Sequence, residues 1–281
     1  MQETIAILFD FDDTLAPDST SGLLATLGVD VPKFWKEEVQ ALLDDDWDPI
    51  PAYLVKMIEM SREGRTKPIT KEIFIEWGKS LPLRSGIEAT FDRLRRLARH
   101  INPRVSVEFY LISSGVEEIL RSTSIAPEFN DIWASQFAYG ADGAISQLKK
   151  VVSFTDKTRY VFQVQKGIFG GAARGKPFEV NRKIPETNLR IPLSNMIFVG
   201  DGYTDIPCFS LIRKGGGTAI GVYEAENREK WGRAWGFIED GRVSNLVPAD
   251  YREKSALSNS LDMAVEAVAR RIAVNSSTYQ G

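Results

Sequence analysis

Two carboxylates stand two residues apart directly after a short apolar run of the sequence. The run is IAILF, residues 5–9, and the segment DFDDTL that follows it contains Asp10 and Asp12. In an extended chain, side chains two positions apart face the same way, so these carboxylates are expected to converge. Converging carboxylates repel one another unless a cation joins them, and oxygen ligands suit a hard divalent ion. The pair therefore predicts a metal site, with a solvated acidic turn as the alternative.

A second acidic segment, GDGYTD, follows the apolar run MIFV at residues 196–199. Asp201 occupies the same place after its run as Asp10 does, which makes it a candidate ligand of the same metal ion. Asp205 falls in the first turn of the next predicted helix. There it either supports the metal site or only interacts favourably with the helix dipole.

A third polar segment consists of Ser113, Ser114 and Gly115, and it follows the apolar run VEFYLI at residues 107–112. A helix is expected to begin directly after it. A hydroxyl group beside free backbone amides at the start of a helix is suited to holding an anion. The alternative is an ordinary serine N-cap.

The elements that must position these residues are short strands and the helices between them. Short apolar runs bounded by turn residues are typical of buried parallel strands, and strands that alternate with helices predict a doubly wound α/β fold with a mostly parallel sheet. Ligands of such sheets bind beyond the carboxyl ends of the strands, so the polar segments are expected to meet at one edge. The expected strands are 5–9, 107–112, 196–199 and 218–222, and the expected helices are 86–100, 116–121, 157–166, 204–213 and 259–272. A further helix is expected around Trp231 and Trp235, with both side chains in the core.

Residues 16–82 interrupt this alternation with helical patterns at 33–43, 52–61 and 71–77 and with no strand pattern. A parallel crossover normally needs far fewer residues. We therefore predict a helical cap at 16–82, inserted into a catalytic core formed by residues 1–15 and 83–281; the alternative is a set of helices that flank the sheet. The aromatic side chains Phe34, Trp35 and Trp47 are expected to fill the interior of the cap; the alternative is that they face a substrate.

Composition excludes several classes of protein. The 281 residues carry a net charge of −3, with one histidine, His100, and one cysteine, Cys208. Most zinc chemistry and an intrachain disulfide are thereby excluded, and there is no strongly basic field for nucleic acid. Because no apolar run approaches the roughly 20 residues that span a bilayer and the N-terminus lacks a basic leader, we expect a soluble cytoplasmic protein with no membrane or nucleic-acid partner.

Taken together, the polar segments resemble those of the haloacid dehalogenase superfamily, in its Asp-x-Asp-x-Thr phosphatase branch. The first motif of that family corresponds to DFDDT at residues 10–14, the second to Ser113, and the fourth to GDG at 200–202 with Asp205. The segments occur in the family's order, and each follows a predicted strand. A helical insertion between the first two motifs is also similar to the family's helical cap, so the resemblance implies a Rossmann-like core with a cap.

The resemblance implies a chemical role for each matching residue. Asp10 would form an aspartyl-phosphate, and Asp12 would protonate the leaving oxygen and then deprotonate water. Mg²⁺ would be held by Asp10, Asp201 and the backbone carbonyl of Asp12, with Asp205 supporting it, and the segment 113–115 would bind phosphate. The family also places a lysine at the start of a helix ahead of the fourth motif.

Two lysines compete for that last position. Lys176 precedes a proline, as in many relatives, but Pro185 and Pro192 make the stretch after it a poor helix. Lys157 opens a clean amphipathic pattern, so it is favoured both as a phosphate-binding and as a catalytic residue. The stretch 167–192, rich in glycine, proline and charge, is then an added surface loop.

The expected function is Mg²⁺-dependent hydrolysis of a small phosphorylated metabolite. The nearest look-alikes are phosphoserine-phosphatase-type enzymes, whose acidic substrate-binding residue nine positions after the nucleophile corresponds to Ser19 here. Phosphoserine itself is therefore not favoured. The alternatives are a phosphotransferase or phosphomutase of the same superfamily and a catalytically silent binding protein. A dehalogenase would not need Asp12 or Asp201, and the sequence does not indicate an oligomeric state.

Overall fold

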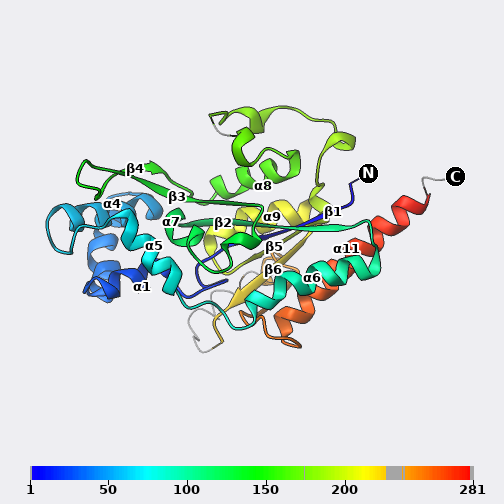
Figure 1. Cartoon of the computed structure of the whole chain (residues 1–281), viewed down its shortest axis with the longest axis horizontal. Helices are drawn as coiled ribbons and strands as arrows, with labels where there is room; N and C mark the ends of the chain where they lie inside the picture. The colour runs from blue at the N-terminus through cyan, green and yellow to red at the C-terminus, as the bar shows by residue number, and fades with distance from the viewer. Residues whose placement is uncertain (1, 174, 226–235, 237, 279–281) are drawn as a thin grey trace.

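The computed structural model describes residues 2–173, 175–225, 236 and 238–278, so Trp231 and Trp235 lie outside the described residues. The described part is built on a seven-stranded sheet with the order β4-β3-β2-β1-β5-β6-β7 (Figure 1). Neighbouring strands are parallel except for β3 and β4, which confirms the predicted mostly parallel sheet. The strands are β1 (Thr4–Phe9), β2 (Ser106–Val116), β3 (Asp131–Tyr139), β4 (Ile145–Lys150), β5 (Met196–Gly200), β6 (Thr218–Tyr223) and β7 (Asn245–Pro248).

Helices cover both faces of the sheet (Figure 1). Alternate residues of the central strand β1 face opposite layers, since side chains alternate along a strand. Ile5, Ile7 and Phe9 join the apolar cluster that contains residues of α6 (Ile87–Ile101) and α11 (Ala256–Thr278). Ala6 and Leu8 join a second cluster with residues of α8 (Asp156–Lys166) and α9 (Ile206–Lys214). Burial on both faces explains why β1 is a continuous apolar run rather than an alternating one.

The chain changes direction across the sheet at β1. It runs outward from β1 through β2, β3 and β4, and then returns to the other side of β1 as β5. Phe9 is paired with Val199, and the backbone N–H of Asp10 donates to the carbonyl of Val199 at 2.9 Å. Connections that leave a parallel sheet in opposite directions open a crevice at the carboxyl ends of the strands. Asp10 and Asp201 both enter that crevice.

The segment between β1 and α6 is helical, as predicted. Each of the three expected helical stretches is present, and a helix that the sequence analysis did not predict, α1, precedes them. Asp18 caps α1 by accepting a hydrogen bond from the N–H of Ser21 at 2.9 Å, the usual role of an aspartate at this position. The elements are α1 (Ser19–Thr26), α2 (Val31–Lys33), the π-helix η1 (Phe34–Val39), α3 (Gln40–Asp44), α4 (Pro49–Arg62) and α5 (Lys71–Ser80).

The hairpin formed by β3 and β4 reaches from the sheet to these helices. The N–H of Ile145 donates to the carbonyl of Ile69 at 2.8 Å, and the ring of Phe137 stacks on that of Phe74 with centroids 5.7 Å apart. The sequence analysis predicted neither strand. For β4 the reason is that it is a half-exposed edge strand with the polar sequence ISQLKK. The apolar clusters of the helical segment and of one sheet face are continuous, so the division into a cap at 16–82 and a core remains a prediction.

The remaining elements are short connections. They comprise α7 (Glu117–Arg121), which follows β2, and single turns of 3-10 helix: η2 (Ala126–Glu128), η3 (Gly170–Ala173), η4 (Glu179–Asn181), η5 (Glu186–Asn188), η6 (Leu193–Asn195) and η7 (Tyr203–Asp205). Three of these turns occupy the stretch 167–192, which joins α8 to the segment before β5. In the part of the chain that the structure describes, no helix has both the length and the apolar character needed to cross a membrane.

The buried residue Glu117 joins the hairpin to α7 through ion pairs with two partly exposed cations. Its Oε2 atom lies 2.7 Å from Nζ of Lys150, and its Oε1 atom lies 2.7 Å from Nε of Arg121. Burial of Glu117 favours its neutral form, but the two cations outweigh it and lower the pKa of the carboxyl group. A carboxylate whose pKa is lower in the folded state stabilises the fold above its unfolded pKa, and this contribution is lost as the pH falls through the folded pKa.

The Glu117→Gln variant is therefore expected to lose about 1–2 kcal/mol in the free energy of unfolding at neutral pH. The deficit relative to the wild type should shrink as the pH falls below the unfolded pKa of glutamate, about 4.3, and through the lower pKa of Glu117 in the folded state. Urea unfolding of both proteins across this pH range measures the difference. Glu76→Gln, at an exposed position of α5, serves as the control; a deficit that does not change with pH would show that charge is not its origin.

Candidate active site

A cavity of about 340 Å³ lies at the carboxyl ends of β1, β2 and β5. The cavity is lined by seven of the eight residues singled out from the sequence, and Asp205 lies fully buried beside it. The sheet thus brings together residues that are far apart in the chain, as the parallel strands predicted. The seven residues are Asp10, Asp12, Ser113, Ser114, Gly115, Lys157 and Asp201.

Lys157 makes the central ion pairs of this site. Its Nζ atom lies 2.9 Å from Oδ1 of Asp10 and 2.7 Å from Oδ1 of Asp205, and its side chain is fully buried. Burial alone would lower the pKa of the ammonium group, but the two carboxylates outweigh it and raise this pKa, so Lys157 stays charged. Lys176, by contrast, is exposed in the 167–192 loop. Of the two candidate lysines, the structure places Lys157 in the site.

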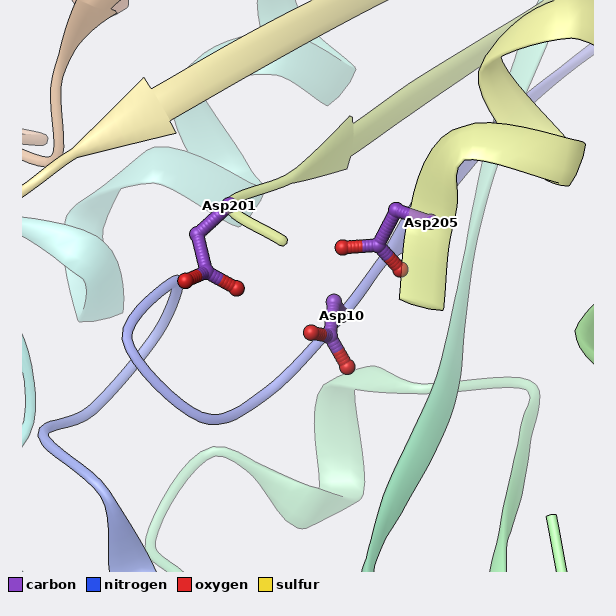
Figure 2. A group of neighbouring side chains, drawn as sticks. All are labelled: Asp10, Asp201 and Asp205. Atoms are coloured by element: carbon purple, nitrogen blue, oxygen red, sulfur yellow. The ribbon is translucent and has the colours of Figure 1, made fainter. Parts of the chain in front are cut away.

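Three carboxylates converge beside Lys157 (Figure 2). Asp10, Asp201 and Asp205 each contribute an oxygen atom, and these atoms lie within 4.8 Å of one another. Asp10 and Asp201 meet because they directly follow the paired strands β1 and β5. Asp205 reaches them from η7, where its Oδ2 atom accepts a hydrogen bond from the N–H of Gly202 at 3.2 Å.

The cluster contains three carboxyl groups beside the single ammonium group of Lys157. Burial, reinforced by repulsion from Asp205, raises the pKa of Asp10 to about 7 in spite of Lys157. Burial and the charges of Asp10 and Asp205 raise the pKa of Asp201 well above its usual range. A hard divalent cation with oxygen ligands would remove this repulsion. The donor set therefore fits such an ion, with Asp10 and Asp201 as ligands and Asp205 engaged in holding Lys157 and the Gly202 amide.

Asp12 has different partners from Asp10. Its Oδ1 atom accepts a hydrogen bond from the backbone N–H of Ser19 at 2.7 Å, at the start of α1. Burial, followed by repulsion from Asp18, raises the pKa of Asp12 to about 8. Burial and Asp18 thus favour the protonated form of Asp12, whereas Lys157 favours the charged form of Asp10. Two carboxyl groups whose surroundings differ in this way are suited to separate acid and nucleophile roles.

The Ser113–Gly115 segment differs from its prediction. It forms the irregular last part of β2, where the pairing with β3 shifts register. The helix expected after it is present as α7, which begins at Glu117. The amide of Gly115 is not free, because it donates to Oγ of Ser113 at 3.0 Å. The carbonyl of Ser114 accepts a hydrogen bond from the hydroxyl of Tyr53 at 2.8 Å. The segment thus lines the cavity in a conformation that its own side chains and α4 hold in place.

Gly115 leaves room for the Asp12 side chain. A methyl group at position 115 would lie 2.8 Å from Oδ2 of Asp12 and 3.2 Å from Oγ of Ser113, so both side chains would have to move. We expect Gly115→Ala to lower about 10²-fold any activity that depends on the position of the Asp12 carboxyl group, since a misplacement of about 1 Å can cost this much. Unfolding should change little, because only side-chain ends obstruct the methyl group. Gly171→Ala, which meets no atom within 4 Å, is the control; equal activity of the two variants would contradict the prediction.

The sequence analysis missed the cavity residues that the helical segment contributes. Trp35 was expected in the interior of the cap, but it lines the cavity, while Phe34 is fully buried and Trp47 is 40% exposed. Asp18 and Tyr53 also line the cavity. The N-cap pattern at Asp18 was a usable signal for the start of α1, but no sequence pattern shows into which space Trp35 and Tyr53 point.

Comparison with known proteins agrees with this site. Residues 7–210 match the family described as haloacid dehalogenase-like hydrolase, which is most of the chain. The chain belongs to this family, and the resemblance inferred from the motifs is confirmed. An uncharacterized protein of Borreliella burgdorferi is 24% identical over 92% of this chain and 95% of its own length.

Solved structures of phosphoserine phosphatases have a similar fold. One, an analogue of the phospho-aspartyl intermediate, has a TM-score of 0.55 at 18% identity, over 93% of this chain and 99% of that chain. A probable phosphoserine phosphatase from Vibrio cholerae, in unliganded form, has a TM-score of 0.58 at 11% identity, over 96% of this chain and 67% of that one. These similarities establish the fold: a haloacid dehalogenase-like core with a phosphoserine-phosphatase-like arrangement.

Proposed function

We propose that this protein is a Mg²⁺-dependent hydrolase of small phosphomonoesters that acts through an aspartyl-phosphate on Asp10. The observation that carries the proposal is the contrast between two carboxyl groups that line one cavity. Asp10 lies 2.9 Å from the buried ammonium group of Lys157, whereas Asp12 accepts a backbone hydrogen bond and has a pKa of about 8. One is thus suited to attack phosphorus and the other to donate a proton.

The first half of the reaction transfers the phosphoryl group to the protein. A carboxylate oxygen of Asp10 forms a bond to phosphorus while the bond from phosphorus to the leaving oxygen breaks. Asp12 gives its proton to that oxygen, and the alcohol departs. Such proton donation typically accelerates a reaction 10²–10⁴-fold. Lys157 favours the charged form of Asp10 and offers a fixed positive charge to the phosphoryl oxygens.

The second half returns Asp10 to its starting state. Asp12, now a carboxylate, takes a proton from a water molecule whose oxygen bonds to phosphorus. The bond between phosphorus and Asp10 breaks, and inorganic phosphate leaves. Splitting one displacement into two through a covalent intermediate lowers the barrier of each. Ser113 lines the same cavity and is the candidate hydroxyl partner of the phosphoryl group.

Asp10, Asp201 and the backbone carbonyl of Asp12 would hold Mg²⁺. When bound, the ion supplies positive charge that neutralises the phosphoryl oxygens and relieves the repulsion between the two carboxylates. The raised pKa values of Asp10 and Asp201 support this assignment, because burial, followed by repulsion between the carboxylates, disfavours their charged forms, and a bound cation would oppose both effects.

Chelation is expected to abolish hydrolysis of p-nitrophenyl phosphate, and added Mg²⁺ to restore it. Mg²⁺ should also raise the melting temperature, since a ligand at about 100 times its Kd stabilises the folded state by about 2.7 kcal/mol. Asp201→Asn should lose this stabilisation, whereas Asp45→Asn, at an exposed position, should retain it. Absence of hydrolysis in the presence of Mg²⁺, with no thermal shift, would overturn the proposal.

A further inference from the structure

Lys157 pairs with Asp10, the proposed Mg²⁺ would lie beside Asp10 and Asp201, and Arg84 lies 3.7 Å from Asp13. Asp18 has none of these cations as a partner, and it is the carboxylate that leaves negative charge in the cavity. Lys157 is the basic side chain that lines it, and among the described residues no arginine and no second lysine does. Two carboxylates already surround that ammonium group. A substrate whose leaving group carries a carboxylate would therefore meet negative charge with no cation to pair with. The acidic side chains that line the cavity are Asp10, Asp12, Asp13, Asp18 and Asp201.

Asp18 is the one of these carboxylates that belongs to the helical segment. It is half-buried at the start of α1, and its Oδ1 and Oδ2 atoms accept from the N–H and the hydroxyl of Ser21 at 2.9 and 2.6 Å. Asp18 takes no direct part in the proposed bond-making steps, although its charge helps to raise the pKa of Asp12. Because two hydrogen bonds fix the group, Asp18 presents a negative charge of defined position to the part of the substrate beyond the phosphate.

Two aromatic rings stand beside Asp18. The indole N–H of Trp35 donates to the hydroxyl of Ser21 at 2.8 Å, the same hydroxyl that Asp18 binds. The ring of Tyr53 lies 5.5 Å from that of Trp35, centroid to centroid, with 60° between the planes. Rings at such an angle form a corner, and both line the cavity. Hydrogen bonds from Trp35 to Ser21 and from Tyr53 to the Ser114 carbonyl hold this corner rigid.

A fixed carboxylate beside two angled aromatic faces is the arrangement that recognises organic cations. The faces of tryptophan and tyrosine attract a cation through their quadrupoles, most strongly when water is excluded. The apolar residues Pro49, Ile50 and Phe154 also line the cavity. These apolar side chains suit methyl and methylene groups, and they offer an anionic or strongly hydrated leaving group no compensating partner.

We propose that the substrate is a phosphorylated amino alcohol: a phosphomonoester whose leaving group carries an ammonium group that Asp18, Trp35 and Tyr53 bind. This inference rests on the proposed phosphatase function and specifies the substrate class of the same cavity. It separates the cavity into a phosphoryl side, with Lys157 and Asp10, and a cation side contributed by the helical segment. A leaving group without positive charge uses only the first of these sides.

Phosphocholine and its uncharged carbon analogue, 3,3-dimethylbutyl phosphate, test the inference directly, because they have the same shape and differ in charge. With Mg²⁺ present, kcat/KM should be at least about tenfold higher for phosphocholine. Asp18→Asn should bring this ratio towards one, since asparagine still caps a helix but carries no charge. Asp30→Asn, the same change at the N-cap of α2 and outside the cavity, should leave the ratio unchanged.

Binding measurements separate this inference from the proposed function. Calorimetric titration of the Asp10→Asn variant with each of the two phosphates should show tighter binding of phosphocholine. Equal or weaker binding of phosphocholine, or a higher kcat/KM for the carboxylated substrate 3-phosphoglycerate, would overturn the inference. If the protein hydrolysed p-nitrophenyl phosphate in that case, the proposed phosphatase function would still hold. Tighter binding of phosphocholine without hydrolysis of any phosphomonoester would support the cation side and overturn the phosphatase function.

Discussion

Replacing Asp10 with asparagine is expected to lower kcat for p-nitrophenyl phosphate by at least about 10⁴-fold, because an amide cannot form the covalent intermediate. The fold should persist, since asparagine has the same size and Lys157 keeps its ion pair with Asp205 at 2.7 Å. Steady-state kinetics with Mg²⁺ measures the loss. Acid-quenched wild-type protein, analysed by mass spectrometry, should carry one phosphoryl group on the peptide that contains Asp10, and the variant should carry none.

The Asp92→Asn variant provides the matched control for this experiment. Asp92 is exposed on α6, where its carboxylate lies 3.3 Å from the guanidinium group of Arg95. Its replacement should leave kcat unchanged and the phosphopeptide in place. If Asp10→Asn kept more than about a hundredth of the wild-type kcat, attack by another group would have to be considered, because loss of a nucleophile costs far more than that. The covalent mechanism would then be wrong.

The part of the fold that positions Asp10 was predictable because local sequence determines it. The strands β1 and β5 are buried on both faces, so they read as apolar runs, and each run ends at an aspartate. Parallel strands in one sheet bring their carboxyl ends to one edge, and this alone predicts that Asp10 and Asp201 meet. Lys157 was found in the same way, from the amphipathic pattern of its own helix.

The side chains that face the cavity from the helical segment were not predictable in this way. An aromatic residue on an amphipathic helix can fill a core or line a cavity, and contacts distant in sequence decide between them. The indole N–H of Trp35 donates a hydrogen bond to the hydroxyl of Ser21, and the hydroxyl of Tyr53 donates one to the carbonyl of Ser114, 61 residues away. These hydrogen bonds fix the orientation of the two rings. The edge strand β4 was not predicted for a related reason. Its own sequence is polar, and its extended conformation depends on pairing with β3.

Asp12→Asn is expected to separate the two halves of the reaction. For an alkyl phosphate, kcat should fall about 10²–10⁴-fold, because the alkoxide must leave without a proton. For p-nitrophenyl phosphate the first half should be affected less, since p-nitrophenolate is a stable anion. The second half still lacks its base, so the aspartyl-phosphate should accumulate. Rapid mixing should then show a burst of about one p-nitrophenolate per protein molecule, followed by slow turnover.

The pH dependence of the wild type supplies the complementary test. Asp12 donates a proton only while it is protonated, and burial together with Asp18 raises its pKa to about 8. For alkyl phosphates, kcat should therefore fall as the pH rises through about 8, and Asp12→Asn should lack this descending limb. Asp13→Asn removes a neighbouring charge that lines the same cavity, at a positive φ of 56° that asparagine tolerates, and should show no burst. Equal losses for both substrates without a burst would show that Asp12 acts as neither the acid nor the base.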